Sequence, residues 1–399
     1  MTTYKETFGK QIKQLSSDPT DAGAEGQIWF NTTDGVFKTV TAVGAWSAGG
    51  SLNTARESGA SGSEGATQNA TFFAGGAAPY RAQSEEYNGT SWSEGNDLNT
   101  ARAMLAGAGS QTAGLGFGGF ISPGGTQSLS EEYNGTSWVE GNNMNTARYG
   151  PAGLGSQTAA VGCAGYSTAN TTLSEEYDGT SWTEGNNLNT ARYGAAGTGS
   201  QTAGIAIGGS TNTSVELYDG TNWTNAAVLP SGRGTNAGNQ AFGVQTSCFL
   251  LGGQPPPSGT TTVQSFDGTN WSTGAALTTA VKQNSGSGST TAGLSFGGKA
   301  SLTLTAATEE FSYSIFSPIA ASWSVGPNTV NSSGARGSAG TKTASLAFGG
   351  QGSPNPIGNS ESWNGTAWSE GNDLNQIRAF SAGCGVQTAA LAFGGDRGP

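Results

Sequence analysis

The 399-residue sequence predicts an all-β fold built from a repeated unit of about four strands. The stretch from Ser130 to Trp138, Ser-Glu-Glu-Tyr-Asn-Gly-Thr-Ser-Trp, recurs in near or looser copies that end in tryptophans 41 to 52 residues apart. Six copies contain an Asn-Gly or Asp-Gly pair, the strongest short signal for a tight β-hairpin turn. A period of this length with these turns is typical of repeat architectures. The tryptophans are Trp46, Trp92, Trp138, Trp182, Trp223, Trp271, Trp323 and Trp368.

Each part of the unit has a structural role that its residue types predict. The small residues from Ala203 to Gly209, which end in a glycine pair, suit an inner strand crowded by its neighbours. Asp219 and Gly220 supply the positive φ angles of a tight turn. Trp223 and Tyr218, five residues earlier, can fill the wedge between adjacent four-stranded sheets. These features predict the blade of a β-propeller.

The strand count predicts how the ring closes. Residues 378–395 supply the first two strands of a unit, and residues 36–46 supply the last two strands of a unit. Pairing these N- and C-terminal strands gives eight four-stranded blades and removes the open edges that a linear array would leave. A ring of seven blades, with one degenerate unit outside it, is the alternative.

The order of glycine pair, Glu-x-Tyr and Trp, with an arginine opening the next strand, resembles the kelch-repeat family of β-propellers. The resemblance covers residues from about 36 to 395 and implies a propeller of four-stranded blades. It leaves the activity open, since propellers of this family serve as scaffolds, adhesins and oxidases. Galactose oxidase is similar in fold, but its copper site needs histidines and this sequence has none.

The N-terminal segment lies outside the repeat. We expect residues 1–25 to be a docking arm and linker and residues 26–399 to be the propeller, beginning with a hairpin around Thr33-Asp34-Gly35. The opening residues and the stretch 25–38 resemble the N-termini of structural proteins of marine tailed bacteriophages. This resemblance implies a virion protein, a tail fibre or capsid appendage on the particle exterior, that contacts other virion proteins through residues 1–25.

The composition argues against several classes of function. The net charge is −11 and the 16 basic residues form no run, so we expect no nucleic acid partner. No apolar stretch approaches the length of a membrane span or a signal-peptide core, so we expect no membrane insertion. We expect the chain to be made in the host cytoplasm without a signal peptide. The absence of histidine removes the commonest general base and metal ligand. We therefore expect no catalytic residue, metal or cofactor, and a polysaccharide-active enzyme is the least favoured hypothesis.

Three cysteines, Cys163, Cys248 and Cys384, lie in or beside predicted strands. Their spacing fits no Cys-x-x-Cys pair. We expect buried free thiols rather than a disulfide or a metal site.

Basic residues recur 10 to 13 positions after each tryptophan and would open the inner strands around one mouth of the central channel. They could bind an anion there, but glutamates on the third strands could pair with them. Such a pair would satisfy two partly buried charges, and we favour this structural role. The residues are Arg56, Arg102, Arg148, Arg192, Arg233, Arg336 and Arg378, with Glu85, Glu131, Glu175, Glu216, Glu309 and Glu361.

The connections between second and third strands vary most from unit to unit, and such loops on a rigid scaffold usually carry recognition residues. Their aromatic and polar residues suit the stacking and short polar contacts of sugar binding. We expect binding through Phe120, Tyr166, Pro255, Pro256 and Pro257. The leading hypothesis is that this face binds a host-surface receptor, a glycan in preference to a protein. A bacterial cell-surface lectin or adhesin is the alternative, and a homo-oligomer is left open.

Overall fold

The computed structural model describes residues 13–16, 28–77, 79–210, 212–232, 240–253, 259–320, 329–330, 334–340, 344–352 and 355–396. Within these residues the chain is all-β, and no helix is long and apolar enough to cross a membrane. The chain divides into two compact units, a first unit of Met1–Ala320 and a C-terminal unit of Ala321–Pro399.

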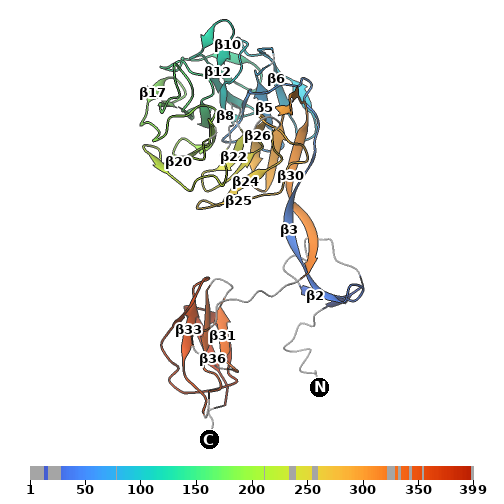
Figure 1. The fold of residues 1–399 in the computed structure, drawn as a ribbon, viewed down its shortest axis with the longest axis vertical. Coiled ribbons are helices and arrows are strands. Elements are labelled where there is room, and N and C mark those ends of the chain that lie inside the picture. The colour runs from blue at the N-terminus through green and yellow to red at the C-terminus, as the bar shows by residue number, and fades with distance from the viewer. Residues whose placement is uncertain are drawn as a thin grey trace. The chain divides into compact units, whose positions relative to one another are not determined.

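Six sheets of the first unit surround a common centre (Figure 1). Sheets 1 to 5 each contain four strands in sequence order. Short turns join the third strand to the fourth, and longer loops join the second strand to the third. In sheet 1 they are β4 (Ala60–Ser61), β5 (Thr71–Ala74), β6 (Ser84–Tyr87) and β7 (Trp92–Glu94). In sheet 2 they are β8 (Ala106–Ser110), β9 (Ala113–Phe117), β12 (Ser130–Tyr133) and β13 (Trp138–Glu140), with a hairpin of β10 (Phe120–Ile121) and β11 (Gly125–Thr126) between the second and third.

The next three sheets repeat this order. Sheet 3 contains β14 (Ala152–Ser156), β15 (Ala159–Cys163), β16 (Ser174–Tyr177) and β17 (Trp182–Glu184). Sheet 4 contains β18 (Ala196–Ser200), β19 (Ala203–Ile207), β20 (Val215–Tyr218) and β21 (Trp223–Asn225). Sheet 5 contains β22 (Ala241–Val244), β23 (Ser247–Leu251), β24 (Val263–Phe266) and β25 (Trp271–Thr273).

Sheet 6 is built from both ends of the first unit. Its order is β26 (Ser285–Ser289), β27 (Ala292–Phe296), β30 (Thr308–Ala320) and β3 (Val36–Ala48), followed by β2 (Ile28–Asn31) and β1 (Lys13–Leu15). A small hairpin of β28 (Lys299–Ala300) and β29 (Thr303–Leu304) lies between β27 and β30. The predicted hairpin at the start of the repeat is present as the antiparallel pair β2–β3.

The first strands of the six sheets contact one another in succession, and β26 of sheet 6 also contacts β4 of sheet 1. Backbone hydrogen bonds follow the same order, since Met104 N donates to Ser58 O at 2.8 Å and Ser58 N donates to Gln283 O at 3.2 Å. The side chain of Gln68 adds a further link, donating to Phe311 O of sheet 6 at 2.8 Å. Sheet 6 therefore lies against sheet 1.

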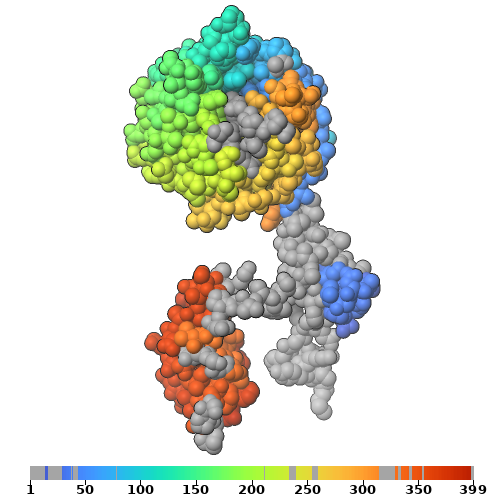
Figure 2. Space-filling model, viewed as in Figure 1, coloured from blue at the N-terminus to red at the C-terminus, as the bar shows by residue number. Residues whose placement is uncertain are grey.

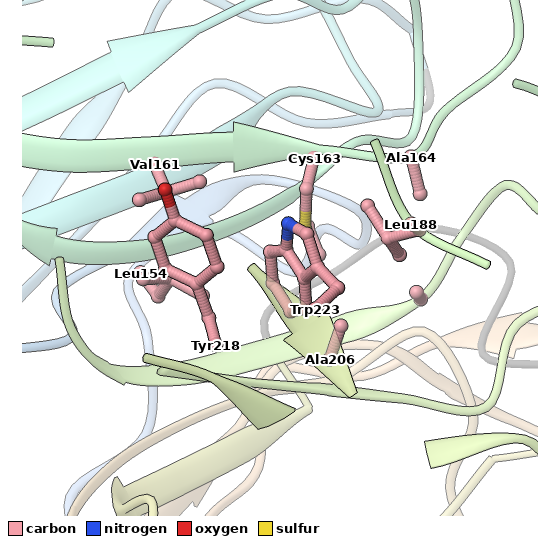
Figure 3. Close-up of a cluster of buried hydrophobic side chains, with 10 residues drawn as sticks. Leu154, Val161, Cys163, Ala164, Leu188, Ala206, Tyr218 and Trp223 are labelled. Carbon is pink, nitrogen blue, oxygen red and sulfur yellow. The ribbon is translucent and has the colours of Figure 1, made fainter. Parts of the chain in front are cut away.

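The core lies in the wedges between neighbouring sheets, where large residues of one sheet pack against small residues of the next. Figure 3 shows Tyr218 and Trp223 of sheet 4 beside Leu154, Val161 and Cys163 of sheet 3. The inner strands approach too closely for larger side chains. A Cβ atom on Gly153 would lie 2.4 Å from the Gly107 carbonyl of the preceding sheet. This crowding explains the small residues of the first strands.

A hydroxyl–carboxylate bond joins the third strands of successive sheets. The adjacent glutamates of each Glu-Glu-Tyr run point to opposite faces, so that Glu131 meets Arg102 while Glu132 accepts the hydroxyl of Tyr177. Where the aromatic is phenylalanine, the preceding sheet has another residue in place of the bonding glutamate, Leu217 before Phe266 and Ser265 before Phe311. The bonded pairs are Tyr87–Glu310, Tyr133–Glu86, Tyr177–Glu132 and Tyr218–Glu176.

The predicted pairing of the N- and C-terminal strands is not the one observed. Strand β3 pairs with β30 over a register from Lys38 opposite Ala320 to Ala48 opposite Glu309, which places Trp46 opposite Phe311. After Phe311 the sequence lacks the Asn-Gly or Asp-Gly turn of other copies, so β30 runs on without folding back. Strand β3 therefore occupies the position of the fourth strand in sheet 6.

The last two repeats form the C-terminal unit. Sheet 7 contains β31 (Gly337–Gly340), β32 (Ser345–Phe348), β33 (Ser360–Trp363) and β34 (Trp368–Glu370). Sheet 8 contains only β35 (Ala382–Val386) and β36 (Ala389–Phe393) among the described residues. The prediction of one eight-bladed ring over residues 26–399 therefore differs from the structure, where the chain divides after Ala320.

Candidate functional site

In sheets 1 to 4 the arginine that precedes the first strand is buried beneath the face where the candidate binding loops lie. In five repeats the guanidinium meets the glutamate of the same sheet, and four of these five pairs are at most 1% exposed. The remaining pair, Arg336 and Glu361, has a 2.8 Å contact. The structure thus brings together the pairs Arg56–Glu85, Arg102–Glu131, Arg148–Glu175, Arg192–Glu216 and Arg336–Glu361.

These pairs hold the backbone of the connection between neighbouring sheets. Glu131 also accepts the backbone N–H of Asn99 at 2.6 Å, and Arg102 donates to Gly118 O at 3.1 Å. Burial lowers the pKa of Arg102, while the carboxylate of Glu131 acts in the opposite direction. A guanidinium so enclosed keeps its charge and supports the loops above it rather than reaching a ligand.

Two of the predicted Arg/Glu residues have other surroundings, and a third is not described. Arg233 lies outside the described residues. Glu309 accepts the backbone N–H groups of Thr278 and Thr279 at 2.7 and 2.9 Å. Arg378 of the C-terminal unit donates to Gly394 O at 3.0 Å, because sheet 8 has no described third strand to supply a glutamate.

In several repeats the residue that follows the buried arginine forms a backbone bridge to the loop between the second and third strands. The side chain at this position is half-buried where it is a tyrosine, as at Tyr149 and Tyr193. Tyr149 and Tyr166 exchange backbone hydrogen bonds of 3.0 and 2.9 Å, and Ala103 and Phe120 form the same bridge at 3.1 and 2.8 Å. The bridge ties the end of the connection from the preceding sheet to the loop between second and third strands. Side chains at these positions therefore stand on a backbone fixed from two sides.

Five aromatic side chains at this face form what we call the aromatic strip. They extend from sheet 1 to sheet 4, and all are half-buried. The rings of Tyr149 and Tyr166 stack at 5.1 Å with an interplanar angle of 26°, and Phe120 meets Tyr149 edge-on at 5.6 Å. Tyr80 lies 6.0 Å from Phe120, and Tyr193 lies 5.9 Å from Tyr149. The strip consists of Tyr80, Phe120, Tyr149, Tyr166 and Tyr193.

A cavity of about 310 Å³ opens beside the strip. Two further residues in its wall, Met104 and Gln283, have φ angles of 55° and 56°. Burial raises the pKa of Tyr149, and Tyr193 and Tyr166 act in the same direction, so its phenol stays protonated at neutral pH. The walls of the cavity can thus offer both aromatic ring faces and hydroxyl donors. They are formed by Tyr80, Met104, Phe120, Tyr149, Tyr193 and Gln283.

The sequence pointed to part of this strip. Phe120 and Tyr166 lie in it as expected for one face, whereas Pro255, Pro256 and Pro257 lie outside the described residues. Tyr149 and Tyr193 were missed, although each directly follows an arginine at a position that is Glu57 or Ala103 in other repeats. In the repeat of sheet 6, Lys282 lies opposite Lys299 in this bridge, so that Val281 holds the place of the buried arginine.

A larger cavity, of about 450 Å³, lies among the turns between first and second strands. Gly199, Gly243 and Gly288 line it together with serine and threonine side chains, and Glu64 is its single acidic residue. Burial raises the pKa of Glu64. The cavity has no aromatic wall, so we place the candidate site at the aromatic strip.

The sequence also led us to expect buried free cysteines and no metal site. Cys163 and Cys248 are buried free thiols, whereas Cys384 is exposed, contrary to expectation, because its sheet has no described neighbour on that side. Among the described residues, no group of three or more Cys, Asp or Glu side chains could hold a metal ion.

Comparison with known proteins reveals the fold and leaves the activity open. No family model matches the sequence, and no curated protein matches it. Among solved structures, YjhT, a protein of β-propeller-type fold, is similar with a TM-score of 0.54 and 13% sequence identity. The similarity covers 65% of this chain and 95% of that chain. At this identity the likeness shows a β-propeller-type fold and nothing of the function.

Proposed function

We propose that sheets 1 to 6 form a closed, kelch-like propeller of six blades, with β3 as the outer strand of the sixth. The contacts between sheets 6 and 1 support this proposal, because the Tyr87–Glu310 bond and the Gln68 link repeat those between other neighbouring sheets. The aromatic pairs Trp92–Phe296 and Phe73–Phe296 fill the same wedge at 4.8 and 5.2 Å.

We propose that this propeller binds a glycan of a host surface through the aromatic strip. The observation that carries the proposal is the contact of five aromatic rings, four of them tyrosines, above buried ion pairs that fix their backbone. Sugar rings stack their C–H faces on aromatic faces, while phenol hydroxyls can bond their hydroxyl groups. Tyrosine also adds little conformational entropy cost on binding, since it has only two side-chain torsions.

The chemistry of the cavity favours binding without catalysis. Glycoside hydrolysis needs two carboxyl groups on either side of the scissile bond. The six residues that line the cavity include none. The third-strand glutamates of sheets 2 and 3, Glu131 and Glu175, are engaged by Arg102 and Arg148. We therefore propose a non-enzymatic binding protein without a cofactor.

We propose that the chain is a virion structural protein of a tailed phage, in a tail fibre or capsid appendage. The resemblance of the N-terminal residues to phage structural proteins supports this assignment. Residues 1–25 would attach the chain to other virion proteins, and the strip would face the host. The docking arm itself lies mostly outside the described residues.

Binding of the full chain to a glycan array and to host cells tests the strip. Tyr149→Ala combined with Tyr166→Ala is expected to weaken binding at least about tenfold, since each lost stacking contact contributes about 1 kcal/mol. Tyr313→Ala, a tyrosine on β30 that is 48% exposed and outside the strip, is the matched control. Unchanged binding in the double variant would rule out the strip as the receptor site.

The location of the chain tests the assignment to a virion. Immunolabelling of purified particles should find the chain on their exterior, and deletion of residues 1–25 should prevent its incorporation. Labelling of bacterial surfaces without particles would favour the lectin or adhesin instead. Release of oligosaccharide from host envelope by the purified chain would favour an enzyme.

A further inference from the structure

Sheet 8 exposes an apolar face that is buried in the corresponding sheets of the first unit. The register places Phe393 opposite Ala382 and Leu391 opposite Cys384, so the four residues share one face, which we call the open face of sheet 8. Leu391 is 62% exposed and Phe393 is 48% exposed. Sheet 8 is the red end of the chain in Figure 2.

The same register in sheet 2 shows what covers such a face. Phe117 lies opposite Ala106 and Leu115 lies opposite Ala108, and all four are buried against the next sheet. The ring of Trp182, from the fourth strand of that next sheet, lies 4.9 Å from Phe117. The open face of sheet 8 therefore has the shape and chemistry of a surface that receives the tryptophan of a following sheet.

Sheet 7 presents the complementary surface, the tryptophan side that covers such a face in the first unit. Its fourth-strand tryptophan, Trp368, and the neighbouring Trp363 are half-buried, while their equivalents Trp182 and Tyr177 are 5% and 1% exposed. Sheet 7 also has Ser338 on its first strand at the register position of Ser61 in sheet 1. Ser61 is the residue that faces Gly286 of sheet 6, with its hydroxyl 3.5 Å from the glycine carbonyl.

Sheets 7 and 8 are packed on each other as neighbours in the first unit are. Phe380 N donates to Ala335 O at 2.9 Å, as Met104 N does to Ser58 O at 2.8 Å. Gln387 donates to Trp363 O at 2.8 Å, as other glutamines do between neighbouring sheets. A Cβ atom on Gly383 would lie 2.6 Å from the Ser338 carbonyl, a closeness also found between sheets 1 to 4. Sheets 7 and 8 therefore repeat the packing of neighbouring sheets in the first unit, and a six-sheet ring that contains them rests on the six-bladed ring proposed for that unit.

We propose that three copies of this chain join their C-terminal units into a second, intermolecular six-sheet ring. In each junction the Trp368 surface of one copy covers the open face of sheet 8 of another. Three pairs of sheets packed in this way close a ring of six, and a heterologous contact that closes gives a finite oligomer. Ser338 of one copy then meets Gly383 of the next, as Ser61 meets Gly286.

Two features of the sequence fit this junction. Sheet 8 has no described third strand, so it offers no glutamate to a tyrosine hydroxyl of a following sheet. Sheet 7 has Trp363 at the position of this tyrosine, and tryptophan has no hydroxyl to pair. No charged residue occurs on β35 or β36, so copies of an acidic chain meet there without like-charge repulsion. A face of this kind on one unpaired chain would be prone to nonspecific association.

The mass of the full chain in solution, measured by light scattering after gel filtration, tests the number of copies. Three chain masses are expected for the natural sequence and one for Leu391→Lys or Phe393→Lys. Val139→Lys, at a 55% exposed valine on β13, should leave the mass at three chains. A single-chain natural protein, or trimers that persist in both sheet 8 variants, would overturn the proposal. Two chains would indicate edge-to-edge pairing of β36, and four would indicate a ring of eight sheets, and either result also overturns it.

Mixing two variants tests which surfaces meet. Trp368→Lys and Leu391→Lys each remove one side of the junction, so each alone is expected to be a monomer and their mixture a two-chain complex. Dimers of Trp368→Lys alone would contradict a head-to-tail contact.

The thiol of Cys384 gives a readout that does not depend on mass. It lies on the open face, so a junction should slow its labelling by at least about tenfold relative to Leu391→Lys. Cys163 and Cys248 are buried with pKa values raised to about 12 and should not react in either protein. Equal labelling of Cys384 in both would refute the junction.

Discussion

Strand β9 in the first unit and strand β36 in the C-terminal unit have nearly the same residues, Ala-Gly-Leu-Gly-Phe and Ala-Ala-Leu-Ala-Phe. Both pair with a first strand in the same register. Leu115 of β9 is fully buried, whereas Leu391 of β36 is 62% exposed. The repeat thus specifies the strand and its pairing, and burial depends on whether another sheet follows.

The two units also differ in how their repeated arginines are used. Arg102 meets Glu131 of the third strand, while Arg378 meets only the Gly394 carbonyl among the contacts described for it. A third strand is needed to supply the carboxylate. Substitutions at equivalent positions should therefore have large effects in the first unit and small effects in the C-terminal unit.

The largest effect is expected at the buried ion pair. Arg102→Met leaves Glu131 charged and buried without its cation, and should destabilise the first unit by about 4 kcal/mol. Arg378→Met should cost less than about 1 kcal/mol, because its partner is a backbone carbonyl at a partly exposed site. Hydrogen exchange of each unit in the full chain measures both. A smaller loss for Arg102→Met combined with Glu131→Met than for Arg102→Met alone would confirm the pair as the cause.

The next largest difference between the two units is expected when the leucine at the equivalent position of each unit is truncated. Leu115→Ala opens a cavity between sheets 2 and 3 and should cost about 3 kcal/mol in the free energy of unfolding of the first unit. Leu391→Ala should leave hydrogen exchange in the first unit unchanged. Equal protection loss at both sites would mean that the units share one core, contrary to the comparison.

A moderate effect is expected for the hydroxyl–carboxylate bonds. Tyr133→Phe removes the donor to Glu86 and should cost about 2 kcal/mol, as for a bond to a charged acceptor. Adding Glu86→Leu should recover most of this loss, because it recreates the natural pair Leu217 and Phe266, which pack in one apolar cluster. Denaturant unfolding of the three proteins measures the coupling, and simple additivity of the two substitutions would contradict it.

The smallest difference in stability between the two units is expected at alkaline pH. Burial and the bond to Glu310 raise the pKa of Tyr87 from 10.0 to about 12. Above pH 10 the unfolded chain loses this proton while the folded chain keeps it, so stability of the first unit should fall between pH 10 and about 12. The C-terminal unit has no tyrosine and lacks this contribution. Tyr87→Phe should make the fall shallower, and an unchanged pH profile in that variant would argue against the linkage.

The repeat pattern was sufficient to predict most of the strands, the Asn-Gly and Asp-Gly turns and five of the ion pairs. Asp219 and Gly220 form a turn as predicted, but only Gly220 of the two has a positive φ, 91°. The Asp219 carboxylate accepts the N–H groups of Thr221 and Asn222 instead. Arg148 and Glu175 meet because their spacing places them on the first and third strands of one sheet. The aromatic strip was predicted only in part, since Tyr149 looked like any other residue after an arginine until the bridge to Tyr166 was known.

By itself the sequence determined an all-β chain of four-stranded repeats, with a buried arginine, a turn and a wedge-filling tryptophan in most of them. These features depend on residues close together in the chain or in one sheet. Only the tertiary structure decided that β3 pairs with β30, that the last two repeats form their own unit, and that five aromatic rings meet at one face. Near-identical repeats can pair with several neighbours, so partner choice depends on where a turn is missing and which sheet lies alongside.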